Sequence, residues 1–420
     1  MYSNDDVNGS TLTLVLAGGQ GKRLSPLTAS KAKPLVSFGG VFRIMDFTLS
    51  NCVHSGIQKA YLLTQYKAES IRHDIEYSSW PVDFVCVPPQ LQNPYRGTAD
   101  AVYKNMDLFC HDRAEYVLIL AADHIYKMDY RRLIRFHASH GGDATIAAVP
   151  YPKQLANQFG ILDIDDNDRV VGFEEKPQDP LPRTADPGTA LASMGVYVFN
   201  ASTLRKALLR DAGNFSGTHE FGKDILPSLV ATDRVFAYDF AKHNADLGTF
   251  WRDVGTIDSY FRAQMELLLV NAALNPFDPR WMVFSRGVNA SFPNDSLSTS
   301  MVVDSLVAPG AKVSGATIRQ SVVSPSVSVA PTAQIIGSVL MPGVKVGRDA
   351  RIQHAIIGED VEIPDGDRIG YDSGEDRRRF HVTENGVVSV PGTGFVQPGD
   401  LRSFQTKKVH FRETPRIPAS

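Results

Sequence analysis

A short glycine-rich segment near the start of the chain has the residues best suited to bind phosphate groups. The apolar run Thr13 to Ala17 leads directly into Gly18-Gly19-Gln20-Gly21-Lys22-Arg23. Glycines lack the Cβ atom that would hold a nucleotide away, so backbone N–H groups can approach its phosphate oxygens. Lys22 and Arg23 add positive charge where a triphosphate would lie. The nucleotide-binding residues predicted in this segment are Leu16, Ala17, Gly18, Gly19 and Gly21.

Two well-known phosphate-binding motifs do not match this segment. A Walker loop has a glycine five residues before the Gly21-Lys22 pair and a Ser or Thr after the lysine, but Leu16 and Arg23 stand there. A dinucleotide-binding fingerprint fails as well, because Leu24 occupies the place of its third glycine. Taken alone, the segment is equally consistent with a glycine turn that carries solvated cations.

A series of further motifs resembles a known enzyme family. In chain order they are Lys31-Ala32-Lys33-Pro34, Phe38-Gly39-Gly40, Arg43-Ile44-Met45-Asp46-Phe47, Tyr95-Arg96-Gly97-Thr98, Ala122-Asp123-His124-Ile125-Tyr126, Phe159-Gly160-Ile161, Glu174-Glu175-Lys176-Pro177, Ser193-Met194-Gly195-Val196-Tyr197, Phe221-Gly222-Lys223-Asp224 and Trp251-Arg252-Asp253-Val254-Gly255-Thr256. Together with the glycine segment they resemble the sugar-phosphate nucleotidyltransferases, most closely the bacterial-type ADP-glucose pyrophosphorylases (glucose-1-phosphate adenylyltransferases). Chance agreement of so many ordered motifs is negligible beside that of a single one.

The resemblance implies a nucleotidyl transfer for glycogen biosynthesis. The phosphate of glucose 1-phosphate would attack the α-phosphorus of ATP, giving ADP-glucose and pyrophosphate. Both reactants are anions, and the attacking phosphate is already ionised at pH 7. Charge neutralisation and alignment therefore matter more than a general base.

By the same resemblance, Asp123 and Asp253 would hold Mg2+, whose preferred ligands are carboxylate oxygens. Arg23 and Lys33 would contact the triphosphate. Without the family context, Asp123 could instead cap a turn at the end of an apolar strand. Asp253 could pair on the surface with its neighbour Arg252.

The sugar and base subsites are assigned by resemblance too. Lys176 would bind the sugar phosphate and Glu175 the sugar hydroxyls, although a Glu-Glu-Lys run is more often a solvated charge cluster. The other residues expected around glucose 1-phosphate are Tyr95, Gly160, Ser193 and Tyr197. Gln90 could offer its amide to an adenine edge, while Gly97 and Thr98 would let the backbone lie against the ring. These features recur in relatives that use other nucleotides, so a sister enzyme using UTP, dTTP or GTP stays an alternative.

Departures from the family pattern concern regulation. Relatives usually have a basic residue, which helps to bind a sugar-phosphate activator, where this chain has Ser30. Pro94 replaces a tryptophan, and the segment from Gln90 to Tyr95 is shorter than usual. We therefore expect weak activation by sugar phosphates. The candidate effector anchors that the chain keeps are Lys31, Arg43, Arg377, Arg378 and Arg379.

Length and composition fit such an enzyme. The 420 residues suggest two or three domains, and 43% apolar content is ample for sizeable cores. A net charge of -3 gives no reason to expect nucleic acid or an anionic membrane as partner. The cysteines Cys52, Cys86 and Cys110 are odd in number and lack metal-ligand spacing, which favours reduced thiols in the cytoplasm. No apolar run approaches the roughly 18 residues of a membrane span, and the N-terminus is polar.

Residues 1–275 are predicted to form a Rossmann-like α/β catalytic domain. β-rich runs alternate with amphipathic stretches of helix length, which predicts parallel strands joined by crossover helices. The expected strands are Leu12–Ala17, Lys59–Thr64, Tyr116–Ala121, Ala144–Val149 and Ser193–Phe199. Parallel sheets bind ligands beyond the carboxyl ends of their strands, so the glycine segment, Asp123 and Gly195 can meet in one cleft.

Residues 276–300, rich in Pro, Asn and Ser, are predicted to be a linker, and residues 301–420 a left-handed parallel β-helix with a C-terminal tail. A period of seventeen residues relates Val323, Leu340 and Ile357. Aliphatic residues recur about every six positions, at Val323, Val329, Ile335, Leu340, Val346, Ile352, Ile357, Ile363 and Ile369. Each coil of such a hexapeptide helix buries its apolar row only against its neighbours, which a β-sandwich would not require. We expect this domain to be a scaffold that supports a homotetramer.

Two rivals of other classes are weaker. A non-catalytic regulatory subunit would be expected to lose one of Asp123, Lys176 or Asp253, and this chain keeps all three. A hexapeptide acyltransferase would need a histidine that activates its acceptor, and the repeat has no evident constellation of that kind. The sequence therefore predicts a Mg2+-dependent enzyme that acts on ATP and glucose 1-phosphate.

Overall fold

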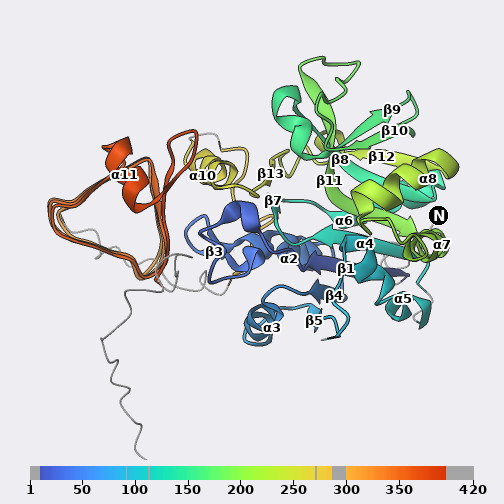
Figure 1. Cartoon of the computed structure of the whole chain (residues 1–420), viewed down its shortest axis with the longest axis horizontal. Coiled ribbons are helices and arrows are strands. Elements are labelled where there is room, and N and C mark those ends of the chain that lie inside the picture. Colours follow the sequence, from blue (N-terminus) through green and yellow to red (C-terminus); the bar gives the residue numbers. More distant parts are fainter. Residues whose placement is uncertain (1–9, 91, 112–113, 270–271, 286–298, 394–420) are drawn as a thin grey trace, which may run out of the picture.

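The computed structural model describes residues 10–90, 92–111, 114–269, 272–285 and 299–393. A sheet-based domain and a β-helix lie beside each other, with α10 (Ile257–Glu266) between them (Figure 1). The N-terminal residues 1–9, part of the expected linker (286–298), the side chain of Cys110 and the expected tail from residue 394 lie outside the described residues.

A mixed sheet of nine strands forms the centre of the N-terminal domain. Its main path runs β10-β9-β11-β6-β1-β4-β5, and β8 joins β11 to β12. The strands are β1 (Thr11–Ala17), β4 (Lys59–Thr64), β5 (Asp83–Val87), β6 (Tyr116–Ala121), β8 (Ala144–Pro152), β9 (Gly160–Ile164), β10 (Val170–Glu175), β11 (Thr189–Asn200) and β12 (Val235–Asp239). β1 lies parallel to both β4 and β6, as predicted.

The expectation of parallel pairing is wrong for β11. This strand runs antiparallel to β6, β8 and β9. Parallel pairing needs a crossover of a dozen or more residues, usually helical, on one face of the sheet. Between β8 and β11 the chain instead forms a short 3-10 segment (Lys153–Gln158) and the β9–β10 hairpin, so it returns in the opposite direction.

Helices cover both faces of the sheet. Leu12 and Leu14 of β1 point into one core, whereas Val15 and Ala17 point into the other, as the two-residue period of a strand requires. The first core is completed by α4 (Thr98–Tyr103), α5 (Asp107–His111), α7 (Ala201–Ala212) and α8 (Leu226–Thr232), and the second by α2 (Ile44–His54), α3 (Ala68–Glu76) and α6 (Tyr130–His140). The result is the expected three-layer, Rossmann-like arrangement.

The C-terminal domain is a parallel β-helix. Its short strands are β14 (Met301–Val303), β15 (Leu306–Val307), β16 (Lys312–Val313), β17 (Thr317–Arg319), β18 (Val322–Val323), β19 (Ser328–Val329), β20 (Gln334–Ile336), β21 (Val339–Leu340), β22 (Lys345–Val346), β23 (Arg351–Gln353), β24 (Ala355–Ile357), β25 (Glu362–Ile363) and β26 (Arg368–Ile369). Val323 pairs with Leu340, and Leu340 with Ile357, which confirms the period of seventeen residues. All the predicted aliphatic positions lie in one buried cluster.

The last coil is closed by elements that the repeat did not predict. Helix α11 (Ser373–Arg379) follows β26, and Asp372 caps it by accepting hydrogen bonds from the backbone of Gly374 and Glu375. The hairpin of β27 (His381–Val382) and β28 (Val388–Val390) then adds β28 to β24.

The β-helix packs on the sheet domain through a second apolar row. Val322, Val339 and Ile356 each precede an inward residue by one position and therefore point outward. They are buried in a cluster shared with Phe38 and Phe42 of the hairpin β2 (Ser37–Phe38) and β3 (Phe42–Arg43). The two domains are thus joined by a continuous apolar contact.

Residues 276–285 of the expected linker are packed on the sheet domain. The ring of Trp281 stacks on His54 with centroids 4.6 Å apart, and its Nε1 donates to Asn51 at 2.9 Å. The backbone N–H of Phe284 donates to Ser50 Oγ.

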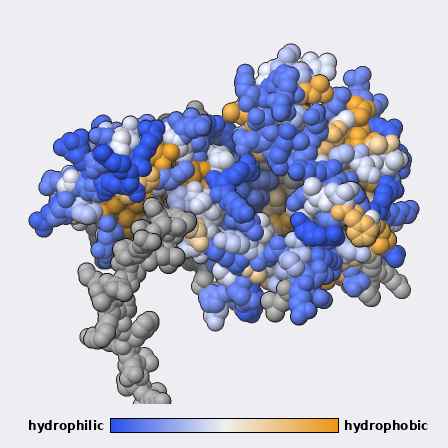
Figure 2. Space-filling view, viewed as in Figure 1, coloured by the Kyte–Doolittle hydropathy of each residue, from blue (hydrophilic) through white to orange (hydrophobic). Residues whose placement is uncertain are grey.

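Hydrophilic residues cover most of the face seen in Figure 2, with hydrophobic residues in small groups. Across the described ranges, none of the helices combines the length and the apolar character that crossing a membrane requires.

Candidate active site

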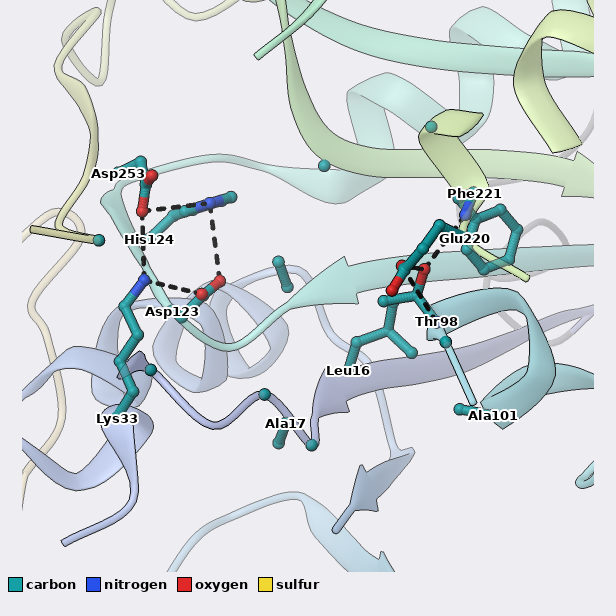
Figure 3. A pocket seen from close by; sticks show the side chains of 18 of the residues that line it. Leu16, Ala17, Lys33, Thr98, Ala101, Asp123, His124, Glu220, Phe221 and Asp253 are labelled. Carbon is teal, nitrogen blue, oxygen red and sulfur yellow. Dashed lines mark hydrogen bonds and ion pairs between the residues drawn. The ribbon is translucent and has the colours of Figure 1, made fainter. Parts of the chain in front are cut away.

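A pocket of about 730 Å³ lies at the carboxyl ends of β1, β4 and β6. The predicted site residues that line it are Leu16, Ala17, Gly18, Gly19, Gly21, Arg23, Lys33, Tyr95, Gly97, Thr98, Asp123, Gly160, Glu175, Lys176, Ser193, Tyr197 and Asp253. Gln90 is exposed beyond the end of β5 and is not among the lining residues. Figure 3 shows the two ends of the pocket, one with Lys33, Asp123 and Asp253 and the other with Thr98 and Glu220.

The glycine segment is packed tightly against the residues that follow it. Gly21 has a left-handed φ of 62° and begins the 3-10 turn Lys22–Leu24. A Cβ atom at Gly21 would lie 3.0 Å from Lys33 Cβ and 3.1 Å from the methyl group of Thr28. The hydroxyl of Thr28 also donates to the carbonyl oxygen of Gly21 at 2.9 Å. Both the turn and the close approach therefore require glycine here.

Lys33 joins the two predicted metal-binding carboxylates. The antiparallel pairing of β7 (His124–Tyr126) with β13 (Trp251–Asp253) sets Asp253 opposite His124. It therefore brings Asp253 beside Asp123. Lys33 Nζ donates to Asp123 Oδ2 at 2.8 Å and to Asp253 Oδ1 at 3.2 Å (Figure 3). Its side chain is only 7% exposed.

Electrostatics keep Lys33 and Asp123 ionised. Burial alone would lower the pKa of Lys33, but the charges of Asp123 and Asp253 more than compensate and raise it above 10.5. Burial likewise acts to raise the pKa of Asp123, whereas Lys33, His124 and Arg23 hold it well below 3.8. At neutral pH, Lys33 is therefore a cation and Asp123 an anion.

The donor set fits a divalent cation. Asp123, His124 and Asp253 each offer one ligand atom, and these atoms lie within 4.8 Å of one another. The carboxylate oxygens are the ligands that Mg2+ prefers. His124 Nδ1 is buried and has no hydrogen-bond partner among the described residues, while Nε2 lies 3.6 Å from Asp123 Oδ1.

Two arginines near this cluster have different partners. Arg23 is 58% exposed, donates to Gln158 at 3.3 Å and lies 4.0 Å from Asp253. Arg252 instead pairs with Glu266 at 2.8 Å, so the alternative in which Asp253 is neutralised by its neighbour Arg252 is wrong. Asp253 is thus directed into the pocket rather than to the surface.

A second charged pair lines the pocket at the end of β10. Lys176 Nζ lies 2.8 Å from Glu175 Oε1, and the backbone of Lys176 is left-handed with a φ of 53°. A Cβ atom at Gly160 would lie 2.3 Å from the ring of Phe173 and 2.9 Å from Glu175 Oε2, so glycine is needed for these two side chains to pack here. Beside it, burial raises the pKa of Tyr197 to about 12, which keeps its hydroxyl protonated.

The start of α4 is held by a segment far along the chain. Glu220 accepts hydrogen bonds from the backbone N–H of Thr98, at 3.2 Å, and from its hydroxyl. The backbone N–H of Phe221 donates to Thr98 Oγ1 at 3.1 Å. On the other side, Gln65 bonds both the N–H and the carbonyl oxygen of Tyr95.

Several lining residues had no role assigned from the sequence: Gln65, His124, Gln158, Phe159, Glu220, Phe221 and Gly222. Four of them lie in the family motifs, which could have pointed to a place in the site: His124, Phe159, Phe221 and Gly222. Gln65 and Glu220 carry no such signal, because they act through contacts across the pocket.

The candidate effector anchors are mostly engaged by carboxylates. Arg43 pairs with Asp46 at 2.7 Å and also with Asp74. Arg379 pairs with Asp367 at 2.6 Å. Arg377 and Arg378 are exposed on α11, which Figure 1 shows apart from β3. Lys31 pairs with Glu359 of the β-helix. The structure therefore does not gather these cations around one site.

Comparisons with known proteins cover both domains. Residues 12–269 match the family model described as nucleotidyl transferase, and residues 289–390 that described as GlmU-like, C-terminal hexapeptide. A glucose-1-phosphate adenylyltransferase of Paramagnetospirillum magneticum is 43% identical over 399 residues, covering 90% of this chain and 93% of the relative. Glucose-1-phosphate adenylyltransferase 2 of Vibrio cholerae is 41% identical over 401 residues, covering 91% and 97%. The chain belongs to the glucose-1-phosphate adenylyltransferase family of nucleotidyl transferases.

Proposed function

We propose that this protein converts ATP and glucose 1-phosphate into ADP-glucose and pyrophosphate, for glycogen biosynthesis. The observation that carries the proposal is the contact of Lys33 with both Asp123 and Asp253 in a pocket that also contains Glu175 and Lys176. Such a pocket has one group of charges for a triphosphate and another for a sugar phosphate. The names of the relatives give the same two substrates.

The proposed mechanism relies on charge and alignment. Lys176 binds the phosphate of glucose 1-phosphate, and Glu175 accepts hydrogen bonds from the sugar hydroxyls, with Tyr95, Ser193 and Tyr197 around the ring. Lys33 and Arg23 contact the triphosphate, whose developing negative charge they stabilise as pyrophosphate leaves. The glycine segment supplies backbone N–H donors. No general base is needed, because the nucleophile is an ionised phosphate.

Asp123 and Asp253 would hold Mg2+ in this scheme. When bound there, it would neutralise phosphate charge and orient the oxygens for in-line displacement. The same two carboxylates hold Lys33 in the structure and are directed into the pocket, and the lowered pKa of Asp123 keeps that carboxylate ionised.

We further propose a homotetramer with weak effector control. The β-helix begins with the edge strand β14, where Met301 is 52% and Val303 37% exposed, and an edge strand of this kind favours pairing with another chain. Arg43, Lys31 and Arg379 are engaged by carboxylates, so an anionic activator would have to displace these partners first.

Pyrophosphate release from glucose 1-phosphate with ATP, UTP, GTP or dTTP tests the activity. We expect release with ATP to exceed that with each other nucleotide by at least about tenfold in kcat/KM, which is about 1.4 kcal/mol of discrimination. A preference for another nucleotide would make the chain a sister transferase. No release with any of them would favour a regulatory subunit instead.

A further inference from the structure

One side chain of the β-helix reaches the segment that carries Lys33. Glu359 follows β24, and its two carboxylate oxygens accept from Lys31 Nζ at 2.5 and 2.7 Å. Glu359 Oε1 also accepts from the hydroxyl of Ser37 at 3.2 Å. A single carboxylate of one domain therefore binds two side chains of the other.

These two contacts lie on either side of Lys33. Lys31 is two residues before it and Ser37 four residues after it. Between them the chain forms a single 3-10 turn, Lys33–Leu35, with hydrogen bonds from Leu35 to Ala32 and from Val36 to Lys33. Because one 3-10 turn has few and poorly aligned hydrogen bonds, contacts from outside contribute strongly to its orientation.

Glu359 itself is firmly held. Ile357, two residues earlier, pairs with Val390 of β28 in a parallel ladder, and the N–H of Gly358 donates to the carbonyl oxygen of Val390 at 2.9 Å. The carbonyl oxygen of Glu359 accepts from the N–H of Thr393 at 3.0 Å. The carboxylate therefore extends from a fixed strand end rather than from a loose loop.

We propose that Glu359 is a positioning residue: through Lys31 and Ser37 it fixes the segment that aims Lys33 at Asp123 and Asp253. This makes the β-helix part of the active-site support, beyond a scaffold for assembly. Lys31 and Glu359 are each about 30% exposed (31% and 29%), so the pair adds little to global stability while it restrains local geometry. The catalytic consequence rests on the function proposed above.

Hydrogen exchange tests the restraint without any activity. In Glu359→Gln and in Lys31→Met, amides in peptides covering residues 32–37 should exchange about tenfold faster, whereas those of β1 stay unchanged, since local opening has its own free energy. The double variant should match Glu359→Gln, because that variant already lacks the ion pair that Lys31→Met removes. If Glu359→Gln does not fold, hydrogen exchange of Lys31→Met tests the same ion pair.

The control is Glu362→Gln. Glu362 pairs with Lys345 at 2.6 Å, three residues along the same β-helix, but that pair is exposed and contacts only its own domain. The Glu362→Gln variant should leave hydrogen exchange in residues 32–37 at the wild-type rate. Unchanged exchange in both test variants, or equal acceleration throughout the sheet domain, would overturn the proposal.

Kinetics test the consequence. Glu359→Gln should lower kcat by about tenfold to a hundredfold, because a small displacement of Lys33 from its aligned position slows the reaction. The KM for glucose 1-phosphate should stay unchanged. The Lys31→Glu, Glu359→Lys exchange should restore part of the loss. Wild-type kcat in Glu359→Gln despite faster exchange would also overturn the proposal. A wild-type enzyme that makes no ADP-glucose would refute the proposed function, and the exchange result would still decide the restraint.

Discussion

Lys33 Nζ lies 2.8 Å from Asp123 Oδ2, although ninety positions separate the two residues in the sequence. Lys33 comes from the turn after the glycine segment and Asp123 from the loop after β6, and both face the pocket. The contact joins the predicted triphosphate-binding lysine to a predicted metal ligand. It also determines how both groups ionise.

The first prediction concerns pH. A raised pKa means that the stabilisation from Lys33 is complete below 10.5 and is lost only as the pH rises through the folded-state value. The lowered pKa of Asp123 means that its contribution is complete above 3.8 and is lost as the pH falls through the folded-state value. Between about pH 5 and 9, the difference in Tm between wild type and Asp123→Asn should therefore stay constant. A difference that halves within this range would contradict a cationic Lys33 beside an anionic Asp123.

Much of the fold could be predicted from the sequence because its signals are local. The parallel pairing of β1 with β4 and β6 follows from alternating strands and helices, and the β-helix interior from the aliphatic rows. The direction of β11 could not be predicted, because it depends on long-range pairs such as Tyr197 with Ile119. The outward row of Val322, Val339 and Ile356 has the same period as the inner row and could have revealed the covered face.

Site residues could be predicted from the sequence where they belong to a motif. Those that act only through a hydrogen-bond partner could not. The glycine segment, the two predicted carboxylates and the predicted lysines Lys33 and Lys176 all line one pocket. Gln65 and Glu220 could not be found, since their place depends on hydrogen bonds to Tyr95 and Thr98 across the pocket. Gln90 does not line the pocket, and its contact with an adenine edge stays a prediction.

The second prediction separates sugar-phosphate binding from chemistry. Lys176→Ala removes a charged partner of the ground-state phosphate, worth about 2 kcal/mol, so the KM for glucose 1-phosphate should rise roughly thirtyfold while kcat changes little. Lys153→Ala is the matched control, because Lys153 pairs with the exposed Asp179 and does not line the pocket. A rise in the KM for ATP instead would show that Lys176 belongs to the other subsite.

The third prediction concerns the joint between the domains. Deleting residues 301–420 would uncover Phe38 and Phe42, so we expect the remaining chain to aggregate and to lose the tetramer. Val339→Asp would bury an unpaired carboxylate in the same contact and lower Tm strongly, whereas Val171→Asp, at a 56% exposed position of the sheet domain, should not. Size-exclusion chromatography and thermal unfolding measure both effects. A soluble, tetrameric and active truncation would refute this view.

The fourth prediction concerns effectors. Ser30 is exposed next to Lys31, whose charge is already paired with Glu359. A new cation at position 30 should strengthen the response to sugar-phosphate activators, since coupling between sites is commonly about 1–3 kcal/mol. Activation curves of wild type, Ser30→Lys and the neutral control Ser30→Ala measure the change. If wild type is strongly activated and Ser30→Lys does not change this activation, the other candidate anchors suffice to bind the activator.

The central claim, that the cluster around Lys33 catalyses adenylyl transfer to glucose 1-phosphate, is tested most directly by the turnover of Asp123→Asn. With ATP, glucose 1-phosphate and saturating Mg2+, we expect wild type to form ADP-glucose and Asp123→Asn to lose about a thousandfold in kcat, about 4 kcal/mol of transition-state stabilisation. Asp179→Asn, at a surface carboxylate 87% exposed, should match wild type. An Asp123→Asn variant that turns over within about threefold of wild type, less than about 1 kcal/mol, would contradict the account.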